Sequence, residues 1–290
     1  MKILKLAFVD FAVNWGPWPN PVQFFADVLK DDYDVRVVKS DFRGYIVEAG
    51  DPPDLVICGH PGSEHEQYFC PKIYFPGEPR SLNLMNYDYE MSYHFSDDPR
   101  HYRLPLYPLY GDVNRLTQPR IFSQDMRMRE FCCVLFGKSY PHNETPREDF
   151  FHRLCKYKKV DSAGTHLNNT GYVIPHKQKA EYIKNYKFVL SFESCSRPGF
   201  TTEKIYEPLL MNTVPVYWGN PKIGLDFDTR SFINSGDYEN LDQVIDAIIK
   251  ADTDDEVYKD MIEWTAFPHN VVNEYARKQN IVKFFRSIVG

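Results

Sequence analysis

Several patterns that define common classes of protein are missing from this sequence. No run of about 18 apolar residues occurs in the 290-residue chain, which argues against a transmembrane helix. No basic stripe accompanies the net charge of −6, so nucleic acid is not an expected partner. The nine histidines form no HExxH motif, and a GxSxG motif is also absent. We therefore expect neither a metal site nor a serine hydrolase, and no cofactor is predicted.

The six cysteines are scattered and form no CxxC pair. This spacing fits neither a disulfide framework nor a zinc site, and reduced thiols are typical of the cytosol. Cys132 and Cys133 are adjacent in a strand-like segment, so their side chains are expected on opposite faces. The apolar N-terminus is interrupted by Asp10 and has no small-residue cleavage site, so we interpret it as a strand. The expected location is the cytoplasm.

The composition is otherwise that of a globular protein with a sizeable core. Apolar residues make up 43% of the chain and charged residues 26%. Aromatic residues, at 16%, are frequent. Most of them are expected in the core, and some of the 20 tyrosines and four tryptophans are candidates for lining a sugar or base pocket.

The first part of the chain alternates strand-like and helix-like segments. The predicted strands are residues 3–9, 34–38, 54–58 and 72–75. A helix is predicted to begin at Asn20 and Pro21, a capping residue followed by proline, and to end near Lys30. This β-α-β order is typical of a doubly wound parallel sheet. Residues 97–118, rich in proline, tyrosine and charge, are the candidate linker.

The same alternation begins again after the linker. The predicted strands are 131–136, 187–192 and 214–218, and the predicted helices are 145–159, 176–186, 202–212, 241–251, 255–264 and 270–288. Thr145 to Glu148 has the pattern of a capping box, and Pro208 predicts a kink.

Two such halves predict an α/β protein with two Rossmann-like domains facing a ligand-binding cleft. The expected boundaries are 1–120 and 121–269, with a C-terminal helix over 270–290 that packs back on the first domain.

The segment from Lys187 to Pro221 carries the clearest functional pattern, because two apolar strands surround a polar loop that opens a helix. Gly199 permits a tight turn, and Thr201 or Thr202 can cap the helix, whose free N–H groups favour an anion. A cation in the first helical turn, such as Lys204, opposes the helix dipole unless it faces a phosphate. The alternative is a solvated surface lysine. The pattern is that of a nucleotide-phosphate pocket.

Arg147 is a second cation close to a helix start, and a guanidinium can grip phosphate oxygens with two hydrogen bonds. Taken alone, Arg147 is more simply a surface residue. Together with Lys204 it offers two positive charges that suit a leaving group gaining negative charge.

Three carboxylates are further candidates. Glu193 and Glu203 flank the polar loop and can accept hydrogen bonds from ribose or sugar hydroxyls. Their structural alternatives are a salt bridge for Glu193 and a helix-start carboxylate for Glu203. Glu78, at a strand end between glycine and Pro79, can act as a general base, although spacing alone favours an ordinary loop glutamate.

These residues together resemble a known family. The run Phe192–Lys204, FESCSRPGFTTEK, resembles the signature of the α-1,3/4-fucosyltransferases of glycosyltransferase family 10. VPVYWGNP, at 214–221, is similar to the bacterial members especially. Further similarity is carried by residues 75–78 with Asn83 and Asp88, by 104–107 and by 145–147. The resemblance therefore spans most of the chain.

The resemblance implies a GT-B fold with an N-terminal acceptor domain and a C-terminal GDP-fucose domain. The implied reaction is inverting transfer of L-fucose from GDP-β-L-fucose to O3 of the GlcNAc in a lactosamine-type glycan, giving a Lewis x-type product. Transfer with α-1,4 or mixed specificity is an alternative, as is another nucleotide sugar. A catalytically inert glycan-binding module is less expected, because it needs no diphosphate clamp.

The resemblance also implies roles for single residues. Glu78 would be the general base that deprotonates the acceptor, and Arg147 and Lys204 would hold the diphosphate. The implied donor-binding residues are Glu193, Ser194, Phe200 and Glu203. Ser194 stands where the family commonly has asparagine, and Phe200 where tyrosine is frequent, so an amide pair and a phenol hydrogen bond are lost there. The loops 15–18 and 81–98 are expected to choose between α-1,3 and α-1,4 products.

The C-terminal segment from Arg277 to Val289 is basic and amphipathic. Its apolar side carries Ile281, Phe284, Phe285 and Ile288. We expect this helix to pack on the domains, and the alternative is peripheral contact with a membrane surface.

Overall fold

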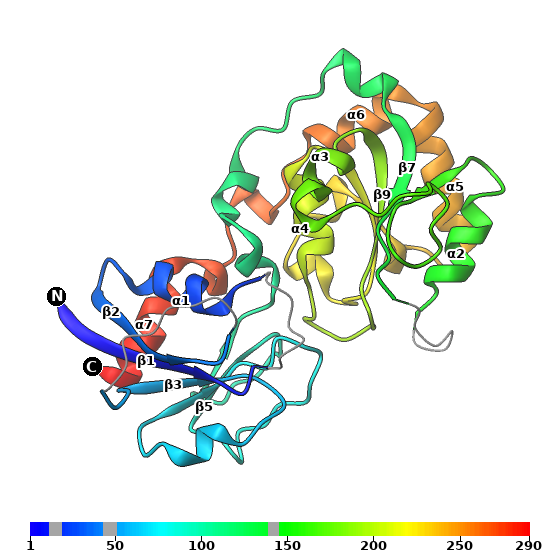
Figure 1. Ribbon diagram of the computed structural model, residues 1–290. Helices are drawn as coiled ribbons and strands as arrows, with labels where there is room; N and C mark the ends of the chain where they lie inside the picture. The colour runs from blue at the N-terminus through cyan, green and yellow to red at the C-terminus, as the bar shows by residue number, and fades with distance from the viewer. Residues whose placement is uncertain (12–18, 43–50, 139–144) are drawn as a thin grey trace. The chain divides into compact units, whose positions relative to one another are not determined.

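The computed structural model describes residues 1–11, 19–42, 51–138 and 145–290 (Figure 1). The chain divides into two compact units. Unit 1 comprises Met1–Gly111 together with Asn273–Gly290, and unit 2 comprises Asp112–Val272. The loop at 15–18 lies outside the described residues.

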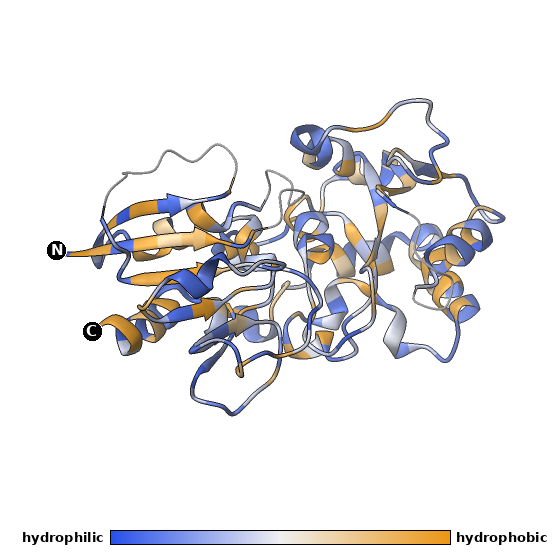
Figure 2. Ribbon diagram, turned by 60° about the horizontal axis from the view of Figure 1, so that its bottom comes forward, coloured by the Kyte–Doolittle hydropathy of each residue, from blue (hydrophilic) through white to orange (hydrophobic). Residues whose placement is uncertain are grey.

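Unit 1 is built on a six-stranded sheet with the order β2-β1-β3-β4-β5-β6, in which every neighbouring pair is parallel. Its strands are β1 (Lys2–Val9), β2 (Tyr33–Ser40), β3 (Leu55–Cys58), β4 (Lys72–Tyr74), β5 (Tyr89–Ser92) and β6 (His101–Arg103). All four residues of β3 are buried, as expected for a parallel strand covered on both faces. Figure 2 shows hydrophobic residues gathered along these strands.

Helices α1 (Pro21–Leu29) and α7 (Lys278–Val289) pack side by side in unit 1 (Figure 1). The Asn20 side chain caps α1 by accepting a hydrogen bond from the Gln23 amide at 3.1 Å, as its sequence predicts. The rings of Phe25 and Phe285 lie 5.7 Å apart, so the apolar side of α7 is covered within this unit.

The last helix begins later than predicted. Residues 270–277, expected to be helical, instead contain irregular backbone and the short 3-10 turn Glu274–Ala276. The backbone at His269 and Asn270 has φ of 57° and 55°. Because this left-handed conformation cannot continue an α-helix, the helix starts only at Lys278.

The segment 97–118 is not a linker along its whole length, because it contains β6. Strands β5 and β6 were missed because they are short and bury polar residues. Ser92 Oγ donates to Glu90 Oε1 at 2.6 Å and lies 3.0 Å from His101 Nε2. Since a buried carboxylate and histidine resemble loop residues in a sequence, no strand pattern was visible there.

The boundary between the two units follows Gly111, whereas the boundary predicted from the sequence follows residue 120. Residues 112–120 are held by unit 2. The carbonyl of Asp112 accepts from the Tyr206 hydroxyl at 3.2 Å, and the guanidinium of Arg120 donates to the Trp264 carbonyl at 3.1 Å.

Unit 2 has a five-stranded parallel sheet with the order β11-β10-β9-β7-β8. The strands are β7 (Glu130–Val134), β8 (Val160–Ser162), β9 (Tyr186–Phe192), β10 (Val214–Trp218) and β11 (Ile233–Asn234). The helices are α2 (Arg147–Leu154), α3 (Lys179–Ile183), α4 (Glu203–Leu210), α5 (Leu241–Thr253) and α6 (Asp255–Glu263). The predicted α/β class with two parallel sheets is confirmed.

The core of unit 2 has two layers, one on each face of this sheet. Cys132 belongs to the cluster that includes Phe150 and Ile248, from α2 and α5. Cys133 packs instead with Ile183 of α3 and with Val189. The prediction that the two thiols point to opposite faces is confirmed. All six cysteines are described, and none forms a disulfide.

The predicted capping box at the start of α2 is wrong. Thr145 Oγ1 is buried without a hydrogen-bond partner among the described residues, and Pro146 occupies the cap position. Glu148 points elsewhere, with its Oε1 2.7 Å from His166 Nε2. The helix also ends at Leu154 rather than near residue 159, because the chain soon enters β8, which pairs with β7.

Candidate active site

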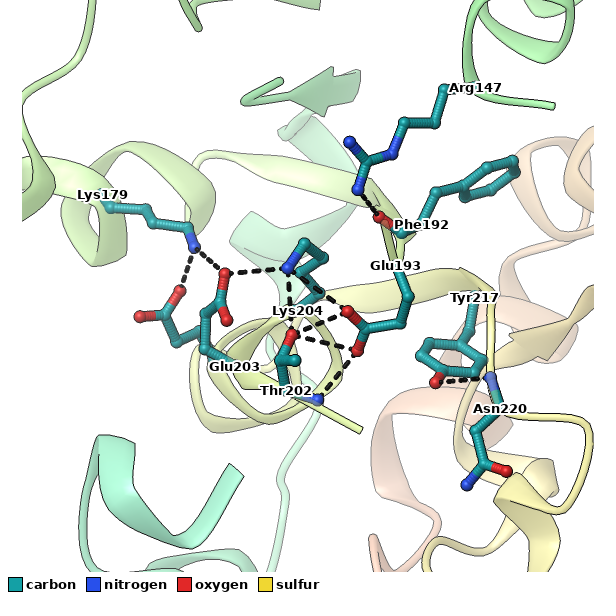
Figure 3. A network of polar contacts seen from close by, with 10 residues as sticks. Arg147, Lys179, Phe192, Glu193, Thr202, Glu203, Lys204, Tyr217 and Asn220 are labelled. Carbon is teal, nitrogen blue, oxygen red and sulfur yellow. Dashed lines mark hydrogen bonds and ion pairs between the residues drawn. The ribbon is translucent and has the colours of Figure 1, made fainter. Parts of the chain in front are cut away.

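The candidate site in unit 2 lies at the carboxyl ends of β9 and β10, where ligands bind in parallel α/β sheets. Asn220 joins the two loops that follow these strands. Its Oδ1 accepts from the Gly199 amide at 2.7 Å, and its Nδ2 donates to Thr201 Oγ1 at 3.0 Å. The Tyr217 hydroxyl accepts from the Asn220 amide at 3.1 Å (Figure 3). Gly199 makes the predicted tight turn with φ of 87°.

Glu193 is fully buried at the end of β9. Its carboxylate accepts from the Thr202 amide at 2.8 Å and from the Thr202 hydroxyl, so this hydroxyl does not cap α4 (Figure 3). Burial raises the pKa of Glu193, and the charge of Lys204 opposes that rise. Gly219 makes room for this carboxylate, because a Cβ at Gly219 would lie 2.5 Å from Glu193 Cγ. Glu193 also forms a salt bridge with Lys204, as one of the two sequence-based interpretations of this residue expected.

Lys204 stands in the first turn of α4 with its ammonium between two carboxylates. Its Nζ lies 3.3 Å from both Glu193 Oε2 and Glu203 Oε1, and 3.0 Å from Thr202 Oγ1. The side chain is 29% exposed, so it is not a freely solvated surface lysine. Burial disfavours its charge, but the two carboxylates outweigh burial and raise the pKa of Lys204. The ammonium is therefore firmly positive.

Lys179, on α3, completes this network. The sequence analysis did not predict Lys179 as a site residue. Its Nζ lies 2.5 Å from Glu207 Oε2 and 3.6 Å from Glu203 Oε1 (Figure 3). Burial opposes ionisation of Glu203, yet the charges of Lys204 and Lys179 together hold the pKa of Glu203 well below its usual range. The sequence does contain one indication of such a cation, because Glu203 and Glu207 are four residues apart and therefore share one face of α4.

Arg147 reaches the same strand end from the first residue of α2. Only 5% of the residue is exposed, and its Nη2 donates to the Phe192 carbonyl at 2.6 Å. The guanidinium also lies over the Phe136 ring, 5.0 Å from its centroid. Its charge is close enough to Lys204 to oppose protonation of that lysine. The structure thus brings the two predicted cations together and excludes a solvated surface position for Arg147.

Ser194 and Phe200 lie in the loop between β9 and α4. Ser194 is half-buried directly after Glu193, whereas Phe200 is 3% exposed. Little of the Phe200 ring is therefore open to a ligand in this structure. The donor contacts of both residues remain predictions.

Glu78 belongs to unit 1 and follows β4. Gly77 before it has φ of 64°, a turn conformation that suits glycine. The Glu78 side chain is exposed, and its carboxylate has no hydrogen bond or ion pair with any described residue. The carboxylate has no structural task in the described part of the chain, which leaves it available for chemistry.

The described residues contain neither a metal-binding cluster nor a membrane-spanning helix. No group of three or more histidine, cysteine, aspartate or glutamate side chains is arranged to hold a metal ion there. None of the helices within the described ranges combines the length and the apolar character needed to span a bilayer.

Comparison with known proteins places this site in a family. The model of the C-terminal part of glycosyltransferase family 10 (fucosyltransferase) matches residues 129–286, more than half of the chain. The chain belongs to this family. The model of the N-terminal domain of alpha-(1,3)-fucosyltransferase FucT matches residues 22–110. The resemblance carried by the motif around Glu193 and Lys204 is thereby confirmed.

Relatives in this family include enzymes with different names. Alpha-(1,3)-fucosyltransferase FucT of Helicobacter pylori is 29% identical over 222 residues, covering 66% of this chain and 46% of that protein. Human GDP-fucose protein O-fucosyltransferase 3 is 27% identical over 198 residues, covering 63% of this chain and 40% of its own length. The chain spans about half the length of the curated relatives it matches.

A crystal structure of an alpha1,3-fucosyltransferase shares the fold. It has a TM-score of 0.79 and 24% identity, and the match covers 99% of this chain and 90% of that one. The glycosyltransferase AviGT4 matches less closely, with a TM-score of 0.53. The fold is that of the GT-B glycosyltransferases, as the family resemblance implies.

Proposed function

We propose that this protein transfers L-fucose from GDP-β-L-fucose to O3 of the GlcNAc in a lactosamine-type glycan, giving a Lewis x-type product. The observation that carries the proposal is the pair of cations, Arg147 and Lys204, at one strand end of a family 10 chain. A nucleoside diphosphate is the ligand that such a pair suits best, because it offers oxygens to both.

On the donor side, Arg147 and Lys204 would hold the diphosphate. Lys204 rests on Glu193, so its ammonium is positioned before the donor arrives. Glu203 would accept a hydrogen bond from a ribose or fucose hydroxyl, because its depressed pKa keeps the carboxylate ionised. Ser194 and Phe200 would contribute the remaining donor contacts.

On the acceptor side, Glu78 would take the proton from O3 as that oxygen attacks C1 of fucose. The bond from C1 to the β-phosphate oxygen breaks, and its electron pair leaves with GDP. Attack from the face opposite GDP converts the β-linked donor into an α-linked product. The negative charge gained by GDP falls beside the two cations, which would stabilise the transition state by several kcal/mol.

We also propose that no metal ion is needed, because two side-chain cations can neutralise the diphosphate. Transfer should continue in excess EDTA, and loss of activity that added Mg²⁺ restores would contradict this. A cytoplasmic location is supported by six cysteines that form no disulfide.

Two measurements test the proposal. Thermal unfolding with GDP or UDP should show stabilisation by GDP, since ligand bound only by the folded state raises the unfolding temperature. Mass spectrometry with GDP-fucose should then detect transfer to N-acetyllactosamine in preference to lacto-N-biose. Stabilisation by UDP alone would point instead to another nucleotide sugar, and transfer to lacto-N-biose would reveal α-1,4 or mixed specificity.

A protein hydroxyl is a second candidate acceptor, favoured by the match to GDP-fucose protein O-fucosyltransferase 3. The donor site and Glu78 would serve either acceptor with the same chemistry. Including a serine- and threonine-containing peptide library in the mass-spectrometric assay separates the two. Fucosylated peptides without fucosylated glycan would overturn the lactosamine assignment.

A further inference from the structure

Unit 1 contains a cavity of about 1060 Å³. Its lining includes none of the residues proposed for the reaction. We call it the His65 pocket. It is lined among others by His60, His65, Asn83, Asn86, Tyr87 and Arg100. It lies on the face of the sheet opposite α1. Phe8 of β1 faces Phe25 of α1, with ring centroids 6.3 Å apart, whereas the neighbouring Ala7 and Val9 pack with Tyr87.

Aromatic rings form one wall of the pocket. The ring of Tyr87 stacks on Tyr74 with centroids 4.5 Å apart and 12° between the planes. The ring of His65 is the other neighbour of Tyr87, and the centroids of these two rings lie 4.7 Å apart. Tyr87 is thus held from two sides and remains half-buried at the cavity. Because its two faces are covered by Tyr74 and His65, the ring offers a ligand its edge and its hydroxyl.

His65 is a buried polar group that is held on one side only. Its Nδ1 lies 2.5 Å from Asp10 Oδ2, and the Asp10 carboxylate also accepts from the amides of Glu64 and His65. The carboxylate can only accept, so Nδ1 carries a proton, and Nε2 is the ring nitrogen left for another partner. The side chain is 8% exposed, and Nε2 has no partner among the described residues. A ligand hydroxyl can form a hydrogen bond with Nε2, because a hydroxyl both donates and accepts.

The pocket has no surplus of charge. Its cationic members are Lys72 and Arg100, and its acidic members are Glu66 and Asp88. The Arg100 guanidinium is already engaged by Asp98, at 3.1 and 2.8 Å. Because the two cations of the lining are matched in number by two carboxylates, it offers phosphate or a sialic acid carboxylate no net positive charge, and a neutral ligand is indicated.

The pocket is connected to the proposed base through the chain and through His60. The loop between β4 and β5 carries Glu78 near its start, and Asn83 to Asp88 near its end line the pocket. His60 lines the pocket and is close enough to Arg80 for that charge, after burial, to lower its pKa. Arg80 lies two residues from Glu78.

We propose that the His65 pocket binds a neutral hexose or N-acetylhexosamine unit of the acceptor glycan, beyond the sugar that receives fucose. The sugar contacts the edge of the Tyr87 ring, and one of its hydroxyls forms a hydrogen bond with His65 Nε2. The pocket then selects extended neutral glycans over short ones. This inference rests on the proposed transferase function for its purpose, but binding to the pocket can be measured without any transfer.

The kinetic test compares two acceptors, the disaccharide N-acetyllactosamine and the neutral tetrasaccharide lacto-N-neotetraose. We expect kcat/KM to be about tenfold higher for the tetrasaccharide, which corresponds to one additional sugar contact. Asn86→Trp fills the pocket from an exposed loop position and should abolish this ratio. Gln67→Trp is the matched control, because Gln67 is an exposed amide near His65 that does not line the pocket. If the Asn86→Trp variant still shows a tenfold higher kcat/KM for the tetrasaccharide than for the disaccharide, the proposal is overturned.

The binding test uses the unaltered protein without GDP-fucose. Titration with lacto-N-neotetraose should shift the ¹⁵N resonance of His65 Nε2, whereas inorganic phosphate should not. Failure of the tetrasaccharide to shift Nε2 overturns the proposal, including the case in which peptides prove to be the acceptors. If transfer is absent but the shift is present, the pocket stands and the transferase function fails.

Discussion

At the residue scale, the site is organised by buried charges that compensate one another. Lys204 lies between Glu193 and Glu203, and Lys179 lies between Glu203 and Glu207. Removing one member of a buried pair costs more than the pair contributes, because the remaining charge is uncompensated. The two lysines therefore hold Glu203 in its ionised form.

Lys179→Met should change how donor binding depends on pH. Glu203 has a depressed pKa, so its ionised form persists as the pH falls, and loss of Lys179 removes one of the charges responsible. The rise of the KM for GDP-fucose in acid should then occur at a higher pH than in the unaltered protein. Lys184→Met, directly after the same helix and paired with the exposed Glu181, is the control and should leave the profile in place. An unchanged profile in Lys179→Met would show that Lys179 does not position Glu203.

Glu78→Gln should reduce kcat by about 10²–10⁴-fold, the usual contribution of a general base. The affinity for GDP should stay the same, because the proposed donor residues belong to unit 2. Single-turnover transfer and calorimetric GDP binding measure the two quantities separately. Asp31→Asn, an exposed carboxylate of unit 1, should keep normal turnover. Near-normal turnover of Glu78→Gln would remove this residue from the mechanism.

At the scale of single elements, β5 and β6 depend on a polar chain rather than on apolar alternation. His101 is buried, and burial lowers its pKa to about 4. Ser92 donates to Glu90, so its oxygen is the acceptor for His101 Nε2–H. The neutral histidine is thus built into the folded state.

The stability of unit 1 should therefore fall in mild acid. The unfolded chain protonates His101 near its usual pKa of about 6.5, whereas the folded protein resists protonation down to about 4. Unfolding free energy should decrease between these pH values by up to about 3 kcal/mol, the equivalent of this pKa difference. His101→Gln should flatten this dependence in urea unfolding series. The exposed His152→Gln should not, and equal slopes in all three proteins would rule out His101 as the cause.

At the scale of the whole molecule, the chain builds most of unit 1, then unit 2, and returns to unit 1 at Asn273. The returning helix α7 supplies buried Ile281 and Phe285 to the first core. Unit 1 is therefore incomplete until the last residues of the chain are present, whereas unit 2 is continuous in sequence.

Phe285→Ala should destabilise unit 1 by about 3–5 kcal/mol, the usual cost of removing a buried phenylalanine. Amide hydrogen exchange should show the loss of protection in unit 1, while GDP should still protect the strand ends of unit 2. Lys283→Ala, exposed on the same helix, should change stability by no more than about 0.5 kcal/mol. Uniform loss of protection across both units would show that their stabilities are coupled.

Local sequence patterns were enough to predict the α/β class, most of the strands and the pair Arg147 and Lys204. These depend on local patterns, namely apolar runs, a proline after a capping asparagine, and cations at helix starts, which a linear chain displays directly. Membership of glycosyltransferase family 10 was predictable for the same reason, because its motif is one continuous run of residues. The α1 cap at Asn20 was predictable because all its partners are within one helical turn.

Which polar residues meet could not be predicted from the sequence, because it depends on the tertiary fold. Lys179 meets Glu203 and Glu207 from another helix, Asp10, directly after β1, fixes His65, and His166 draws Glu148 away from the predicted capping box. Short strands such as β8 and β11 are likewise defined by their neighbours in the sheet. Hydrogen bonds and ion pairs between distant segments leave no periodic trace in a sequence, because they depend on where the chain folds back.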